Sequence, residues 1–156
     1  MMRIYLYVCL FLVISALSCG DNQEPTPQLP SEFKMELDIM TLVNAHRKTL
    51  GLDTLVVNEV VKREAQKHCQ QMADGLVPYG NEGLLSRIQR IKEKMIVTEY
   101  AENVSVGQPT AAEVIQTWKN GDSTRVSLEK DFHFAGSSVR RSDSGDYYYV
   151  LLMVKN

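Results

Sequence analysis

Residues 100–118, YAENVSVGQPTAAEVIQTW, place a strand pattern directly before a capped helix. Tyr100–Val106 is rich in aromatic and β-branched residues, which favours a strand. In Thr110-Ala-Ala-Glu113 the hydroxyl and the carboxylate can each accept a hydrogen bond from the other residue's backbone N–H, and this capping box predicts a helix that ends near Trp118. The stretch therefore indicates a domain that contains both helices and strands.

Three helices are predicted on the N-terminal side of this stretch. The first spans residues 36–50 and ends at Gly51, because glycine commonly follows the last turn of a helix. Asn58 can cap the second helix, which ends at Gly75. An apolar stripe at helical spacing supports the second helix: Val61, Ala65, His68, Cys69 and Met72. A short third helix is indicated by Leu84, Leu85, Ile88 and Ile91.

The C-terminal part is predicted to be a β-hairpin. Phe132–Arg140 and Tyr147–Val154 are rich in strand-forming residues, and turn-forming residues occupy 142–146 between them. Three or four helices around a small, mostly antiparallel sheet make an α+β domain, with the layers of an α-β-α sandwich.

The first 32 residues are not expected to belong to this domain. Residues 1–18 resemble a signal peptide, with Arg3 before an uncharged apolar run from Ile4 to Ile14. Residues 19–32 are polar and hold three prolines, which is typical of a tether. The folded domain is therefore expected to span 33–156.

Cys19 is the predicted membrane anchor. The preceding Ala16-Leu17-Ser18 resembles the bacterial lipobox, although Ala16 stands where the usual pattern has leucine. The resemblance implies a diacylglycerol on Cys19, and two acyl chains hold a protein stably on a bilayer. We therefore expect a protein exported to the cell envelope; ordinary secretion after cleavage near Ser18 is the alternative.

Charge and cysteine content exclude several classes of protein. The formal net charge is −2 and no basic stripe is present, so no nucleic-acid partner is expected. Cys69 is the single cysteine of the predicted domain, so it is expected to be a buried apolar residue rather than half of a disulfide.

Several motifs, in order, resemble the CAP superfamily of cysteine-rich secretory, antigen 5 and pathogenesis-related proteins, in its cysteine-poor bacterial branch. The matching segments are Asn44-Ala-His-Arg47 with Gly51-Leu52, Ala65–Ala73, Pro78-Tyr-Gly-Asn-Glu-Gly83 with Arg87, Ala101-Glu-Asn-Val104, and Trp118 with Thr124-Arg-Val-Ser-Leu128. The resemblance implies the α-β-α sandwich of that family.

Many members of that family have a cleft in which two histidines and acidic residues can hold a divalent cation such as zinc. In this sequence Asn81 and Thr124 fall at the two histidine positions, Glu102 is retained, and Asp122 lies beside the second acidic position. An amide and a hydroxyl do not replace imidazole as zinc ligands. We therefore expect no metal and no cofactor, and a ligand cleft formed by Asn81, Glu102, Thr124 and Arg125.

The roles of several of these residues stay open at this point. Glu102 either faces the cleft or braces the junction between helix and strand, and Arg125 orients either a ligand or a backbone turn. Trp118 and the histidines His46, His68 and His133 are expected to be structural. Another histidine beside Glu102 would favour an enzyme.

The leading functional hypothesis is a non-catalytic module that binds an envelope ligand or protein. The alternative is a hydrolase that acts on peptide or cell-wall material through Glu102. Lipid binding, known in some relatives, is a third hypothesis, but no segment of the sequence marks a lipid groove.

Overall fold

The computed structural model describes residues 31–156, so the predicted signal peptide, Cys19 and nearly all of the tether lie outside the described residues. In chain order the elements are α1 (Ser31–Thr49), β1 (Val56–Val57), α2 (Glu59–Ala73), α3 (Leu84–Lys92), β2 (Glu99–Val106), α4 (Ala111–Asn120), α5 (Asp122–Glu129), β3 (Phe134–Arg141) and β4 (Tyr147–Lys155). None of the helices in residues 31–156 has the length and apolar character that crossing a membrane requires.

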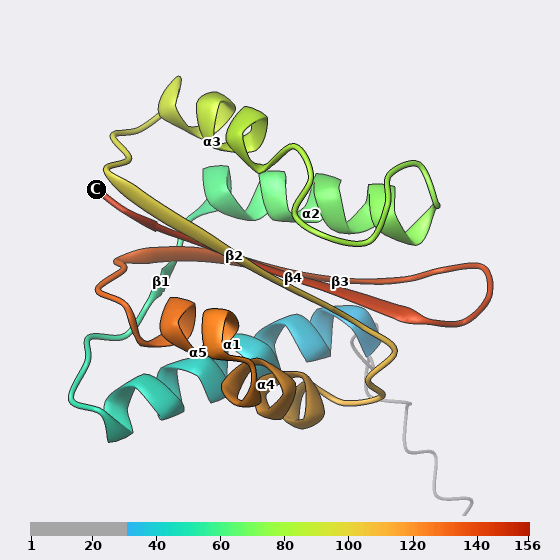
Figure 1. The fold of residues 1–156 in the computed structure, drawn as a ribbon, viewed down its shortest axis with the longest axis horizontal. Helices are drawn as coiled ribbons and strands as arrows, with labels where there is room; N and C mark the ends of the chain where they lie inside the picture. The colour runs from blue at the N-terminus through green and yellow to red at the C-terminus, as the bar shows by residue number, and fades with distance from the viewer. Residues whose placement is uncertain (1–30) are drawn as a thin grey trace, which may run out of the picture.

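The sheet has the strand order β1-β3-β4-β2. β4 pairs antiparallel with both β2 and β3, and the short β1 pairs parallel with β3. In Figure 1, α2 and α3 cover one face of the sheet, and α1, α4 and α5 cover the other. The predicted α+β sandwich with a mostly antiparallel sheet is confirmed, with five helices in the described residues rather than three or four.

Two apolar cores fill the spaces between the three layers, and β4 contributes to both. Leu151 and Met153 belong to the core beneath α1 and α4, whereas Val150 and Leu152 belong to the core beneath α2 and α3. This division follows from the pleat of a strand, which sends successive side chains to opposite faces. Because β4 lies inside the sheet, six of its successive residues (149–154) are fully buried.

Gly136 lets α2 approach β3 more closely than any other residue would allow. A Cβ atom at this position would lie 2.3 Å from Lys62 Cα and 2.7 Å from the Val61 carbonyl carbon. These are backbone atoms, which cannot move aside as the end of a side chain can. The packing of α2 on the sheet therefore depends on the absence of a side chain at this position.

The structure differs from the sequence prediction at three elements. α1 begins at Ser31, five residues before the predicted start at Glu36, and the Glu36 side chain forms ion pairs with Lys62 and Arg140. α4 ends at Asn120, and the following α5 was not predicted. β1 was also missed, since two exposed valines carry no periodicity that a strand could be recognised by.

Two polar residues of α1 hold the loop that follows α1 and the C-terminal end of α5. The Asn44 side chain bonds to both the N–H and the carbonyl of Leu55, at 2.8 and 3.0 Å. The fully buried Arg47 guanidinium donates to the carbonyls of Leu128 and Lys130, at 2.8 and 2.7 Å. Arg47 thereby fixes the C-terminal end of α5, and α5 forms one wall of the candidate site.

Candidate functional site

β2 is an edge strand, and its successive side chains point alternately toward the two helical layers of the sandwich. Glu102 faces α2 and α3, where Arg87 binds its carboxylate. Asn103 faces α5, where its Nδ2 donates to the Thr124 carbonyl at 2.9 Å. Because side chains alternate along a strand, the side chains of Glu102 and Asn103 point toward opposite faces of the sheet.

The Glu102 carboxylate is fully buried in an ion pair with Arg87. Arg87 Nε donates to Oε1 at 3.1 Å, and one amino group of the same guanidinium donates to Oε2. The Glu102 side chain has 0% exposure and the Arg87 side chain 6%. Arg87 also donates to the Glu82 carbonyl at 2.7 Å, so the pair ties α3 and the loop before it to β2.

His68 of α2 lies beside this pair. Its Nε2 donates to the Gly80 carbonyl at 2.8 Å and is 3.9 Å from Glu102 Oε2. Burial lowers the pKa of His68, although the bond to Gly80 and the charge of Glu102 oppose that shift. A neutral imidazole has one N–H to donate, and Gly80 receives it. His68 therefore fastens the loop after α2 to the core, as predicted for a hydrogen-bonded core histidine.

The polar side chains at Asn81 and Thr124 are also engaged in backbone hydrogen bonds. Asn81 Nδ2 donates to the Glu102 carbonyl at 2.8 Å. Thr124 Oγ1 donates to the Trp118 carbonyl at 2.7 Å, in the turn between α4 and α5. Both side chains therefore stabilise the walls of the site.

Side chains also cover the backbone at the outer edge of β2. The Val104 carbonyl accepts from Trp118 Nε1 at 3.1 Å and from the Tyr79 hydroxyl at 3.4 Å, while Asn81 covers the Glu102 carbonyl. Exposed carbonyls at a sheet edge invite pairing with another strand. These three side chains oppose such pairing at β2.

A cleft of about 380 Å³ runs along this edge. It lies between β2, α5 and the loop after α2, and its lining residues are Tyr79, Asn81, Ala101, Glu102, Asn103, Val104, Ser123, Thr124 and Ser127. Asn81, Glu102 and Thr124 thus converge on one cleft, but the Glu102 carboxylate is fully buried against Arg87. The groups offered to a ligand are hydroxyls and amides rather than charges.

Arg125 is not among the residues that line this cleft. Its guanidinium pairs with Glu129 at 3.3 Å and Asp122 at 3.6 Å, both on its own helix. Asp122, beside the expected second acidic position, has a fully exposed carboxylate. The charged residues of α5 therefore pair with one another outside the cleft.

The comparisons with known proteins agree with this architecture. The model of the CAP (cysteine-rich secretory protein) family matches residues 40–154. The chain belongs to the CAP family. Protein YkwD of Bacillus subtilis is 27% identical over 116 residues, which cover 72% of this chain and 45% of that protein.

Solved structures share the CAP fold at low sequence identity. A cysteine-rich secretory protein from Staphylococcus aureus has a TM-score of 0.69 at 19% identity, over 83% of this chain and 41% of that chain. An outer surface protein from Borrelia burgdorferi has a TM-score of 0.69 at 17% identity, over 79% of this chain and 93% of that chain. The chain thus spans less than half of YkwD and of the staphylococcal protein but matches almost the whole borrelial one.

The cleft of this CAP domain does not fit the zinc ion that the family resemblance implies. Zinc in proteins takes nitrogen, thiolate or carboxylate ligands in a tetrahedral arrangement. Here an amide and a hydroxyl donate to backbone carbonyls, and the retained carboxylate is bound by a guanidinium. Within residues 31–156 no three His, Cys, Asp or Glu side chains are grouped so that they could hold a metal ion.

The three histidines of the CAP domain lie apart from one another. His46 contacts Glu129 at 3.2 Å, and His133 contacts Asn156 at 2.6 Å, both outside the cleft. His68 does lie beside Glu102, the acidic residue retained at the family's cleft position. From the sequence, such an arrangement would favour an enzyme. However, His68 and Glu102 have side-chain exposures of 1% and 0%, so neither reaches a molecule in the cleft.

Sequence reasoning missed the residue that determines the state of Glu102. Arg87 was recognised only as part of a family motif, and nothing in its spacing to Glu102 predicts an ion pair between them. Trp118 is 1% exposed, which confirms that it is a core residue. Its indole N–H also fixes the edge of β2 at Val104, a role that the sequence does not indicate.

Proposed function

We propose that this CAP protein is exported to the bacterial cell envelope, is anchored by a diacylglycerol on Cys19, and binds a ligand or partner in the β2 cleft without chemical turnover. One observation carries the proposal: the carboxylate of Glu102 is buried in an ion pair with Arg87, while hydroxyl and amide groups line the cleft. Export is supported by the sequence of residues 1–19 and by relatives described as an extracellular protein and an outer surface protein.

The lining of the cleft favours a neutral, polar ligand such as a carbohydrate chain. Tyr79 is 53% exposed and offers a ring and a hydroxyl oxygen, whose proton is donated to the Val104 carbonyl at 3.4 Å, and Ser123 adds a second hydroxyl. Hydroxyls both donate and accept, which suits a ligand that is rich in hydroxyl groups. A charged ligand would enter this cleft without a counter-ion, at a cost in desolvation.

A binding assay with soluble cell-wall glycan fragments tests the ligand class. We expect saturable binding to the purified protein, and a loss of about tenfold in affinity for Tyr79→Ala, since aromatic and hydrogen-bond contacts contribute about 0.5–1.5 kcal/mol each. Leu85→Ala is the matched control, because Leu85 is 72% exposed and does not line the cleft. Equal affinities of the two variants would exclude the cleft as the binding site.

The loss of the metal site is tested by zinc titration in a calorimeter. We expect no binding stronger than micromolar, because the groups at Asn81 and Thr124 are poor zinc ligands and are already engaged. A dissociation constant below micromolar would refute this account of the cleft.

The hydrolase alternative has less support from the geometry. General acid–base catalysis needs the catalytic group within hydrogen-bond reach of the substrate, and the Glu102 carboxylate has no exposed surface. Release of soluble products from cell-wall fragments, at a rate that Glu102→Gln abolishes while the variant stays folded, would establish the hydrolase instead.

The anchor is tested by cell fractionation. Cys19→Ala removes the sulfur atom to which the proposed diacylglycerol would be attached, so we expect the protein to leave the membrane fraction or to retain its signal peptide. Unchanged fractionation and an unchanged mature mass would contradict lipidation at Cys19.

A further inference from the structure

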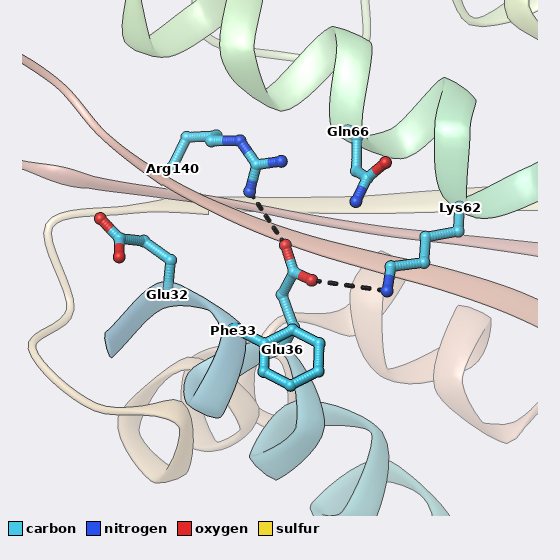
Figure 2. A pocket seen from close by; sticks show the side chains of 6 residues that line it. All are labelled: Glu32, Phe33, Glu36, Lys62, Gln66 and Arg140. Carbon is cyan, nitrogen blue, oxygen red and sulfur yellow. Dashed lines mark hydrogen bonds and ion pairs between the residues drawn. The ribbon is translucent and has the colours of Figure 1, made fainter. Parts of the chain in front are cut away.

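A second pocket, of about 440 Å³, lies at the opposite edge of the sheet from the β2 cleft. β1 pairs with only Phe134 and Ala135 of β3, so the remainder of that edge borders a space between α1 and α2. Figure 2 shows the side chains that line it: Glu32, Phe33, Glu36, Lys62, Gln66 and Arg140.

Glu36 forms the buried floor of this pocket. Its Oε1 accepts from the Val139 N–H at 3.1 Å and from Arg140 at 3.0 Å. Its Oε2 lies 3.8 Å from Lys62 Nζ, and the side chain is 6% exposed. Glu36 thus covers an edge N–H of β3 and holds two cations at the pocket.

Arg140 and Lys62 retain donor capacity toward the open side of the pocket. Arg140 uses a single amino group for Glu36 and for the Val139 carbonyl; its Nε and its other amino group have no partner among the described residues. In Figure 2 that other amino group points toward the side where Gln66 lies. Lys62 Nζ is 3.8 Å from Glu36, beyond hydrogen-bond distance, and 5.7 Å from the centre of the Phe33 ring.

The charged residues that line the pocket balance formally, two cations against two carboxylates, but they are not evenly placed. Two cations face the single buried carboxylate of Glu36. The other acidic residue, Glu32, lies on the far side of Arg140 from Lys62 and Gln66 in Figure 2. A ligand with one negative charge would meet Arg140 and Lys62 on the side away from Glu32, whereas a dianion would be repelled more strongly by Glu36 at short range.

We propose that this pocket binds an organic monoanion: a carboxylate attached to an apolar or planar group. The carboxylate would accept from the free Arg140 N–H groups, from Lys62 and from the Gln66 amide, which suits the preference of guanidinium for two-point recognition of carboxylates. The apolar group would contact Phe33, whose ring is 40% exposed. The pocket is separate from the β2 cleft, and this proposal does not depend on the function proposed for that cleft.

The test is a titration of the purified protein, labelled with ¹⁵N, with benzoate, the neutral benzamide, and inorganic phosphate. We expect saturable shifts with benzoate at the side-chain N–H groups of Gln66 and Arg140. Benzamide lacks the charge and phosphate lacks the planar group, so each should bind at least about tenfold more weakly than benzoate, as expected for the loss of one charge-assisted contact.

Lys62→Met and Lys67→Met form a matched pair on α2. Lys67 is exposed and does not line the pocket, so its replacement changes the net charge equally without touching the site. We expect Lys62→Met to weaken benzoate binding about tenfold and Lys67→Met to leave it unchanged. Gln66→Ala provides a second variant that removes a donor without disturbing the ion pairs of Glu36.

Several results would overturn the proposal. They are the absence of saturable benzoate shifts at the pocket, equal binding of benzoate and benzamide, and an equal effect of the two lysine variants. Phosphate binding without benzoate binding would also refute it, because the ligand would then be an inorganic anion.

Discussion

Breaking the buried pair of Arg87 and Glu102 should strongly destabilise the protein. Glu102→Gln removes the charge that neutralises a guanidinium of 6% exposure, and Arg87→Met leaves a carboxylate with no access to water. Removing one partner of a buried ion pair costs about 3–5 kcal/mol, because the remaining charge stays buried without compensation. We expect each single variant to lose that much free energy of unfolding.

The double variant Arg87→Met/Glu102→Leu should lose less than the sum of the single variants. It leaves no unpaired charge, and apolar replacements of a buried pair are often close to neutral. Some cost remains, since Arg87 also donates to the Glu82 carbonyl. We therefore expect the double variant to lose no more than about 3 kcal/mol, which implies a coupling energy of at least about 3 kcal/mol between the two positions.

Urea unfolding, analysed by linear extrapolation, measures these values. The control is Arg90→Met, one turn further along α3, which breaks the pair of Arg90 with Glu64 at 2.7 Å. The Arg90 side chain is 40% exposed, so this variant should lose no more than about 1 kcal/mol. If Glu102→Gln lost no more free energy of unfolding than Arg90→Met, Glu102 would not stabilise the fold through Arg87. Its carboxylate would then again be a candidate catalytic group in the cleft.

The other predictions concern packing, the loop after α1 and the free thiol. Gly136→Ala should destabilise the protein by about 3 kcal/mol or more, measured by the same urea assay, because its Cβ would meet the backbone of Lys62. Asn44→Ala should cost about 2 kcal/mol in that assay, because both hydrogen bonds to Leu55 are lost. Burial raises the pKa of Cys69 to about 12, so the native thiol should stay unreactive toward a disulfide reagent at pH 8 and react after unfolding. Because the unfolded thiol ionises at a lower pH, the stability that Cys69 contributes is present below about pH 9 and is lost as the pH rises toward 12.

The fold could be predicted where a residue pattern has a local physical cause. The Asn58 cap of α2 is present, with its side chain accepting from Val60 N–H at 2.9 Å, and Thr110 caps α4 through the Glu113 N–H. The hairpin of β3 and β4 also follows the alternation and turn residues of its sequence. In each case the decisive contacts join residues that are close in the chain.

The features that were missed depend on contacts between distant residues. α5 is a short amphipathic helix whose C-terminal end is held by Arg47, more than 80 residues earlier in the chain. Glu36, in the second turn of α1, contacts Val139 and Arg140, more than 100 residues later. No residue pattern near these positions indicates such contacts, so α5 was missed and the start of α1 was predicted five residues too late.

The candidate site shows the same difference between features that the sequence predicts and contacts that it does not. The sequence could place Asn81, Glu102 and Thr124 in one cleft, because a family resemblance carries the positions of residues along the fold. It could not show what each functional group contacts.

The side chains at the two substituted positions, Asn81 and Thr124, donate to the Glu102 and Trp118 carbonyls, and the carboxylate of Glu102 is bound to Arg87. The altered positions and the retained one are thus linked through the structure around β2, and restoring a single imidazole would leave the carboxylate where Arg87 holds it. A retained acidic residue is therefore evidence for catalysis only when its carboxylate is free to face the cleft, and in this CAP domain the arginine beside it determines that.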